Sequence, residues 1–153
     1  MTLSPFEQRV RLYVMDRIIV SGRAPTTAET ARALRVAEDD AADAYRRLAE
    51  AHALVLAPET LNVWMANPLS AVPTGFPVTV AGRRHFANCI WDALGIVAML
   101  AGADGEGRVM TWCPDCAEPL TFEVLGGHPD PSIEAVAHFA VPAAAWWENI
   151  GYT

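Results

Sequence analysis

A cysteine and an aspartate, Cys89 and Asp92, stand three positions apart within the apolar run Phe86–Ala101. Residues three apart share a face of a helix, so this spacing places a thiol beside a carboxyl group. A helix that is apolar on all sides is normally buried, so the run predicts a site where water is scarce. A buried carboxyl group usually has a partner or a chemical task. The alternative interpretation is that Asp92 lies near a helix end and caps a neighbouring loop.

The other two cysteines, Cys113 and Cys116, have the CxxC spacing that lets two thiolates reach one metal ion. A closed tetrahedral site needs two more ligands, and the candidates are Cys89, Asp92, His85, His128 and His138. Because there is no second CxxC, the motif is only weak evidence for a zinc site. The evidence for a thioredoxin-like role is also weak, because the motif does not open a helix after a strand. In the remaining interpretation, Cys113 is a small buried apolar residue and Cys116 is an incidental neighbour.

Composition indicates a globular chain of one medium domain or two small ones. The 153 residues are 52% hydrophobic and 19% charged, and the formal net charge is −7. An acidic chain repels phosphates, which disfavours nucleic acid and anionic membranes as partners. We expect a cytoplasmic protein with no membrane span, because the sequence shows neither a secretory signal nor a long uncharged apolar stretch.

The first 66 residues predict three helices and a β-hairpin, the pattern of a winged helix. Helical apolar spacing covers residues 5–20, and Thr26 with Glu29 forms a capping box for a second helix. A third helix is expected over residues 38–51, followed by extended runs at 53–56 and 61–65. Its acidic start opposes DNA binding, so we expect this unit to be a lid or packing partner. Residues 67–77 are predicted to be a linker.

Residues 78–153 are predicted to form a second unit that carries the cysteines. Strands are expected at 78–80, 108–112 and 120–124, and another at 133–141 would place His138 in an apolar core. His85 is expected at the exposed start of the Cys89 helix. The fold class is therefore α+β: a winged-helix-like three-helix part followed by a small mixed β-sheet with a buried central helix.

Several of these segments together resemble the organomercurial (alkylmercury) lyases. The resemblance is carried by Val78–Arg84, by Cys89-x-x-Asp92 in an apolar helix, by Cys113-Pro114 with Pro119 and the strand after it, and by His138–Pro142 with Trp146. It covers most of the chain, and the order and spacing of the motifs are more specific than any single one. The resemblance implies a helical, winged-helix-like N-terminal part and a C-terminal part of sheet and helix that holds the site.

The resemblance also implies a chemistry, which is protonolytic cleavage of a carbon–mercury bond without an organic cofactor. In that family two cysteine thiolates bind mercury and an aspartate handles the proton. Cys89 matches the first cysteine, Asp92 matches the aspartate, and Cys113 matches a cysteine that is mainly structural. Thiolates suit a soft metal, and a thiol needs a nearby base to ionise at neutral pH. Asp92 could take that proton and return it to carbon.

The sequence departs from the family at one position. The usual second catalytic cysteine would lie within Ser132–Ala137, where this chain has none. Cys116 is an additional cysteine, and we hypothesise that it supplies the second thiolate, so the candidate metal ligands are Cys89, Cys116 and Cys113. Three functions follow: a short, divergent lyase acting on a small organometal, a non-catalytic protein that binds mercury, zinc or copper, and a metal-sensing winged-helix regulator. Oligomeric state is left open.

Overall fold

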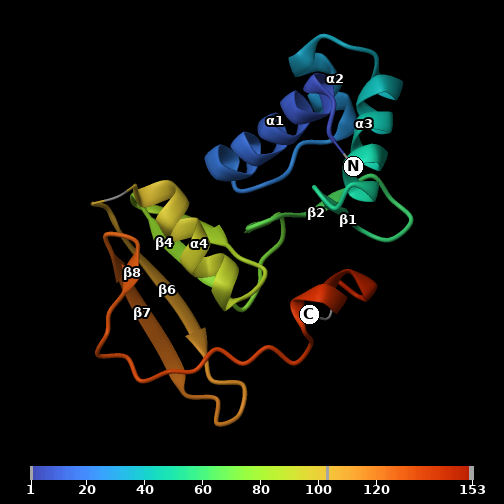
Figure 1. The fold of residues 1–153 in the computed structure, drawn as a ribbon. Coiled ribbons are helices and arrows are strands. Elements are labelled where there is room, and N and C mark those ends of the chain that lie inside the picture. Colours follow the sequence, from blue (N-terminus) through green and yellow to red (C-terminus); the bar gives the residue numbers. More distant parts are fainter. Residues whose placement is uncertain (1, 103, 152–153) are drawn as a thin grey trace.

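The computed structural model describes residues 2–102 and 104–151. Three helices come first: α1 (Pro5–Ser21), α2 (Thr27–Leu34) and α3 (Glu38–Glu50). A small antiparallel sheet follows, with the order β1-β2-β3, formed by β1 (Val55–Leu56), β2 (Val63–Ala66) and β3 (Leu69–Ser70). Figure 1 shows α1–α3 grouped on one side of the molecule. This order matches the sequence prediction, while the assignment of a winged helix stays a prediction.

The second half is built on a larger sheet with the order β5-β4-β6-β7-β8. Its strands are β4 (Pro77–Val80), β5 (Arg83–Phe86), β6 (Glu106–Trp112), β7 (Pro119–Leu125) and β8 (His128–Pro129). The pairings described for this sheet are antiparallel, where the sequence suggested a mixed sheet. The helix α4 (Ile90–Ala101) packs on β4 and β6, and a 3₁₀ helix, η1 (Ala143–Glu148), comes late in the chain.

Local sequence explains where the first helices begin. Ser4 and Glu7 form a reciprocal capping box at α1, and Thr26 and Glu29 form the same box at α2, as the sequence predicts for α2. The helix α1 ends at Gly22, whose φ of 74° suits a residue without a side chain. These signals lie within a few residues of each other, which is why sequence alone could place them.

One hydrophobic cluster joins the two halves of the chain. Its members are buried apolar side chains from α1, α3, both sheets and α4, and among them are Val10, Val14, Leu48, Leu69, Val78, Ile96 and Val109. An isolated bridge between Leu69 and Ala87 also connects β3 to the segment between β5 and α4. Residues 67–77, predicted as a linker, contain β3 and the first residue of β4, and Leu69 is fully buried. The segment that leads into α4 pairs with the small sheet, and the helix packs on the larger sheet.

Three further features differ from the sequence prediction. The strand β5 replaces the expected helix start, because Ala81 and Gly82 both have positive φ and form a tight two-residue hairpin turn. Only one face of α4 is buried, and Trp91 is 66% exposed. Residues 133–141 form no strand, because Pro129 and Pro131 cannot donate the hydrogen bonds that would extend β8. His138 is therefore exposed and outside any core.

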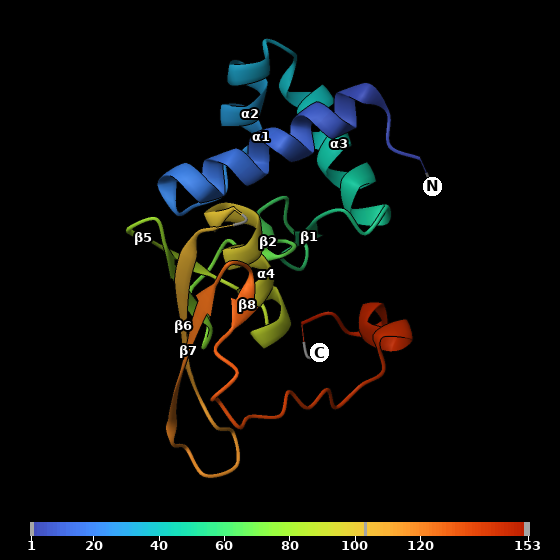
Figure 2. The same cartoon turned by 60° about the vertical axis from the view of Figure 1, so that its left-hand side comes forward.

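The segment after β8 returns to the first half of the chain. Figure 2 shows it running around the lower side of the molecule toward η1. The Trp147 ring stacks on the His52 ring, with centroids 4.0 Å apart, and Trp146 Nε1 donates to the Val141 carbonyl at 2.8 Å. His52 is exposed, and this aromatic contact joins it to the late part of the chain. Within residues 2–102 and 104–151, every helix is too short or too polar to cross a membrane.

The contact between α4 and the larger sheet depends on a glycine in β6, Gly107. A Cβ atom built on Gly107 would lie 2.6 Å and 2.9 Å from the two γ-carbons of Val97, which is fully buried on α4. We expect Gly107→Ala to lower the free energy of unfolding by about 1–3 kcal/mol, because the helix must move away from β6. Urea unfolding measures this difference.

The matched control is Gly95→Ala on the same helix, where an added Cβ meets nothing within 4 Å. That change should stabilise the protein by up to about 1 kcal/mol, since alanine favours a helix over glycine. Equal effects of the two substitutions would show that close packing of α4 on β6 is not what requires Gly107.

Candidate functional site

Cys89 is the residue that caps the N-terminus of α4. Its backbone is extended, with φ −149° and ψ 179°, and its Sγ accepts a hydrogen bond from the Asp92 backbone N–H at 3.5 Å. The first N–H groups of a helix lack partners inside the helix and carry partial positive charge, so they favour a negatively charged sulfur. The side chains of Cys89 and Asp92 therefore both belong to the first turn of α4, as the three-residue spacing predicts.

The Asp92 carboxyl group has a partner that the sequence did not reveal. Asn88 Nδ2 donates to Asp92 Oδ2 at 3.0 Å, and the same amide contacts Asn67 Oδ1 at 3.0 Å and the Pro68 carbonyl at 3.3 Å. Asn88 Oδ1 is buried and has no partner among the described residues. One side chain thus connects the loop before β3 to the catalytic candidate on α4. A sequence signal existed, since Asn88 lies four positions before Asp92 beside an apolar helix.

Partial burial changes the ionisation of both groups. Burial raises the pKa of the Cys89 thiol, and the nearby Asp92 carboxylate raises it further, while backbone N–H groups of Asp92 and Trp91 oppose the rise. Burial also raises the pKa of Asp92, and the hydrogen bond from Asn88 opposes this. At neutral pH Cys89 is therefore a thiol, beside a carboxyl group that holds a proton more readily than an exposed aspartate does.

Cys113 and Cys116 lie elsewhere, in the turn between β6 and β7. Cys113 is half-buried and Cys116 is exposed, and both are free thiols. Across residues 2–102 and 104–151, no group of three or more histidine, cysteine, aspartate or glutamate side chains is arranged to hold a metal ion. The structure therefore brings Cys89 together with Asp92, but it does not gather Cys89, Cys113 and Cys116 into one group. Their shared ligation of a metal stays a prediction.

The histidines do not join either cysteine group. His85 is 5% exposed in β5, paired in register with Val78, so the expected exposed position was wrong. Its Nδ1 has no partner among the described residues, and burial together with the charge of Arg83 lowers its pKa. The sequence could not show this, because the strand β5 itself was not predicted. His128 and His138 are exposed.

An apolar cavity of about 690 Å³ lies beside the first turns of α4. Ile90 and Leu94 line one part of it, and Trp112 and Pro114 at the end of the β6–β7 hairpin line another. The segment after β8 contributes further side chains, among them Ile133 and Val136. A largely apolar cavity with a few polar groups nearby is the usual form of a small-molecule site. Cys89 immediately precedes a lining residue of this cavity.

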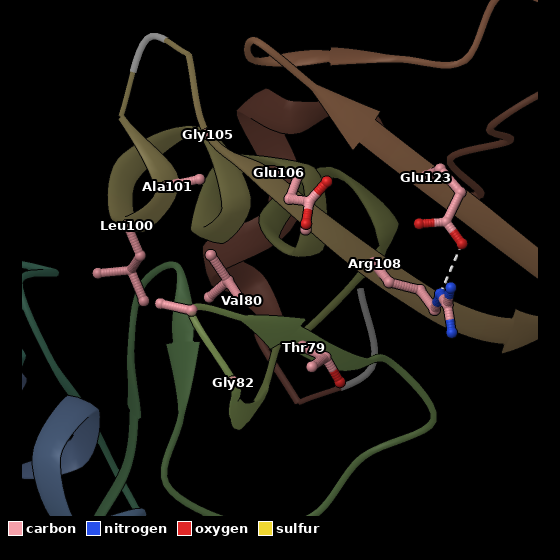
Figure 3. A pocket seen from close by; sticks show the side chains of 11 residues that line it. Thr79, Val80, Gly82, Leu100, Ala101, Gly105, Glu106, Arg108 and Glu123 are labelled. Atoms are coloured by element: carbon pink, nitrogen blue, oxygen red, sulfur yellow. Dashed lines mark hydrogen bonds and ion pairs between the residues drawn. The ribbon is translucent and has the colours of Figure 1, made fainter.

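A second cavity of about 440 Å³ lies at the opposite end of α4 (Figure 3). Leu100 and Ala101 line it from the helix, and Arg108 and Glu123 contribute from neighbouring strands. Figure 3 shows these two charged side chains joined by an ion pair, whose N–O distance is 2.5 Å. Its described lining contains no cysteine or histidine, so thiol chemistry belongs to the other end of the helix.

Comparison with known proteins places this site in a family. The model of the family "MerB: Alkylmercury lyase" matches residues 69–153, which is more than half of the chain. The chain belongs to the alkylmercury lyase family. Among solved structures, the mercury-bound form of MerB2 has a TM-score of 0.67 and 19% sequence identity, covering 84% of this chain and 60% of that one. This chain therefore spans less than two thirds of that protein, and the likeness concerns the fold. No curated protein sequence matches the chain.

The region matched to the alkylmercury lyases contains both candidate groups. Cys89, Asp92 and the positioning amide of Asn88 lie within it, as do Cys113 and Cys116. Asn67, whose Oδ1 contacts Asn88, lies two residues before the matched region begins. The family region and the preceding chain thus meet at the hydrogen bonds that hold Asp92.

The Asn88 hydrogen bond predicts the behaviour of Asp92. Replacing Asn88 by alanine removes a donor that favours the carboxylate, so the pKa of Asp92 should rise further. Titration of the aspartate carboxyl carbons by NMR measures the shift. Asn62→Ala, in an exposed loop, is the matched control and should leave the Asp92 titration unchanged. A lower pKa in Asn88→Ala would contradict the assigned role.

The burial of His85 predicts a pH dependence of stability. The unfolded chain binds a proton at this residue near pH 6.5, whereas the folded chain resists doing so until the pH is lower. Neutral His85 therefore contributes its full stabilisation above about pH 6.5. This contribution decreases as the pH falls from there toward the lower pKa of the folded state. Urea unfolding between pH 7 and 5 should show a smaller loss for His85→Gln than for wild type. The exposed His128→Gln should follow wild type, and parallel curves for all three proteins would contradict this.

Proposed function

We propose that this protein is an alkylmercury lyase-like enzyme that cleaves a carbon–mercury bond by protonolysis, using Cys89 and Asp92. The main support for this proposal is the arrangement of side chains in the first turn of α4. There Cys89 caps the helix, and Asp92 is held by Asn88 in a partly buried position next to an apolar cavity. Membership of the alkylmercury lyase family supports the substrate class.

The first step is attachment of the organomercurial to Cys89. A thiolate is a soft ligand that suits a soft metal, so the Cys89 sulfur bonds to mercury and displaces its weaker ligand. Because the thiol is protonated at rest, its proton must leave as the sulfur–mercury bond forms. Asp92 is the nearest described carboxyl group in this turn and takes that proton. Its raised pKa makes it a better acceptor than an exposed aspartate.

The second step returns the proton to carbon. Sulfur coordination raises the electron density on the metal and weakens the carbon–mercury bond. Asp92 then protonates the carbon, a carbon–hydrogen bond forms as the carbon–mercury bond breaks, and mercury stays on Cys89 with a second sulfur ligand. Asn88 stabilises the carboxylate that results. The partly buried setting strengthens each of these charge interactions.

The second sulfur ligand comes from a small-molecule thiol in this proposal. The sequence hypothesis gave that role to Cys116, but the described residues do not gather Cys116 with Cys89 and Asp92. The apolar cavity would hold the alkyl or aryl group of the substrate against Ile90 and Leu94. No organic cofactor enters the reaction, and mercury is substrate and product. Turnover without any added thiol would show instead that a second protein sulfur reaches Cys89.

The first helices have a supporting role in this proposal. The helix α3 begins with Glu38, Asp39 and Asp40, all exposed, so the helix that would read DNA in a winged helix presents negative charge to phosphates. Its buried side holds Tyr45 and Leu48, which belong to the common core. We propose that this part positions the loop before β3, and hence Asn67, rather than binding nucleic acid.

A binding protein of the same fold is the alternative, and one observation favours it. The three thiols occupy two separate places, so the chain offers a single protein sulfur beside Asp92. Such a protein would retain mercury, or zinc or copper, without releasing a hydrocarbon. Retention of one mercury per chain with no hydrocarbon released would support this alternative.

Hydrocarbon release from an aryl- or alkylmercury compound with excess small thiol tests the proposal. Wild type should release it above the background of thiol alone. Asp92→Asn should lower the rate by about 100-fold or more, because a general acid contributes roughly 10²–10⁴-fold. Cys89→Ser should lower it to background.

The matched control for this test is Asp16→Asn, the same change at an exposed position on α1. It should keep the wild-type rate. Circular dichroism of each variant establishes that it is folded. An Asp92→Asn protein that turns over at the wild-type rate would remove Asp92 from the mechanism.

A further inference from the structure

The turn between β6 and β7 holds two thiols that the proposed reaction does not use. Cys113 follows the last residue of β6, and Cys116 lies three positions later near the tip of the hairpin. Figures 1 and 2 both show this hairpin extending away from α1–α3. Cys116 is exposed and Cys113 is half-buried, so neither thiol has the full burial of a core residue. The interpretation of Cys113 as a buried small apolar residue is therefore wrong.

Backbone hydrogen bonds close the turn that holds both cysteines. The Cys113 N–H donates to the Glu118 carbonyl at 2.8 Å, and the Ala117 N–H donates to the Cys113 carbonyl at 2.9 Å. Ala117 has a φ of 59°, which reverses the chain directly after Cys116. The two cysteines lie three positions apart in this closed turn, the CxxC spacing that lets two sulfurs reach one metal ion.

Both thiols of this turn are free, and the Cys116 thiol is exposed to ions in solution. Thiolates, rather than thiols, bind metals, so a soft cation replaces the thiol protons as it binds. Cys89 differs, because its sulfur caps the N-terminus of α4 and lies beside the Asp92 carboxyl group.

We propose that Cys113 and Cys116 form a two-thiolate site for one soft d10 cation, mercuric or cuprous, separate from Cys89. A structural zinc site requires four protein ligands, and the described residues supply two here. Mercuric and cuprous ions accept two sulfur ligands, so the pair suffices for them. The site needs no movement of α4 and no participation of Asp92.

The position of the pair suggests what the site does. Pro114, between the two cysteines, lines the apolar cavity, and Ile90 and Leu94 of α4 line the same cavity. Cys89 directly precedes Ile90 and Cys113 directly precedes Pro114, so a mercuric ion leaving Cys89 would have a second sulfur site next to the same cavity. This acceptor role rests on the proposed function, whereas the binding site itself does not.

Mercuric ion alone, titrated into reduced Cys89→Ser protein against a competing small thiol, tests the site. The expected result is one ion bound per chain, the sulfur-to-mercury charge-transfer absorption of a two-thiolate complex, and the loss of two titratable thiols. Adding Cys113→Ser or Cys116→Ser to this background should each lower the affinity by at least about 100-fold, since even changes outside the ligand shell cost 10–100-fold.

Three results would overturn the proposal. The first is a Cys89→Ser protein that binds no mercury against the competitor. The second is undiminished affinity in both double variants. The third is a complex of two chains per ion by native mass spectrometry, which would make the site intermolecular. None of these measurements uses an organomercurial, so failure of the carbon–mercury cleavage test leaves the result of this experiment interpretable.

Discussion

The whole site depends on keeping a carboxyl group partly buried next to a thiol. Removing a carboxylate from water costs several kcal/mol unless it is paired or protonated. Here the neutral amide of Asn88 offsets only part of that desolvation energy, so the pKa of Asp92 stays above its ordinary value. A positively charged partner would have lowered that pKa and fixed the carboxylate. A neutral donor instead allows the group both to accept a proton and to give it away.

The rest of the fold can be understood as the support for that amide. Asn88 must reach Asp92 and the loop at Asn67 and Pro68 at the same time, so α4 and the small sheet have to keep a fixed relation. The bridge between Leu69 and Ala87 fixes the segment before α4 against the small sheet. Gly107 allows the helix itself to lie close to β6, where Val97 packs against the glycine. Residues far from the thiol therefore decide where the Asp92 carboxyl group lies.

The sequence could predict what depends on neighbours along the chain. The capping box of α2 and the pairing of Cys89 with Asp92 in one turn are of this kind, since both follow from three-residue spacing. The burial of His85 was not predicted, because it depends on strands that meet across the fold. The role of Asn88 was missed although its spacing to Asp92 is local, and its contacts with Asn67 and Pro68 depend on the fold. The apolar residues 133–141 were misread as a strand, since apolar composition cannot show whether a partner strand is available. The missing second cysteine was visible in the sequence, but its consequence was not.

In the proposed reaction, that consequence is a division of roles between Cys89 and the pair Cys113 and Cys116. At Cys89, burial and a nearby carboxylate keep the sulfur protonated until a metal replaces the proton, which suits a reaction that must deliver that proton to carbon. Cys113 and Cys116 share one turn in which the Cys116 thiol is exposed, which suits retention of an ion. Cys89 and Cys113 each precede a residue that lines the same apolar cavity, so the arrangement fits cleavage at one place and capture at the other.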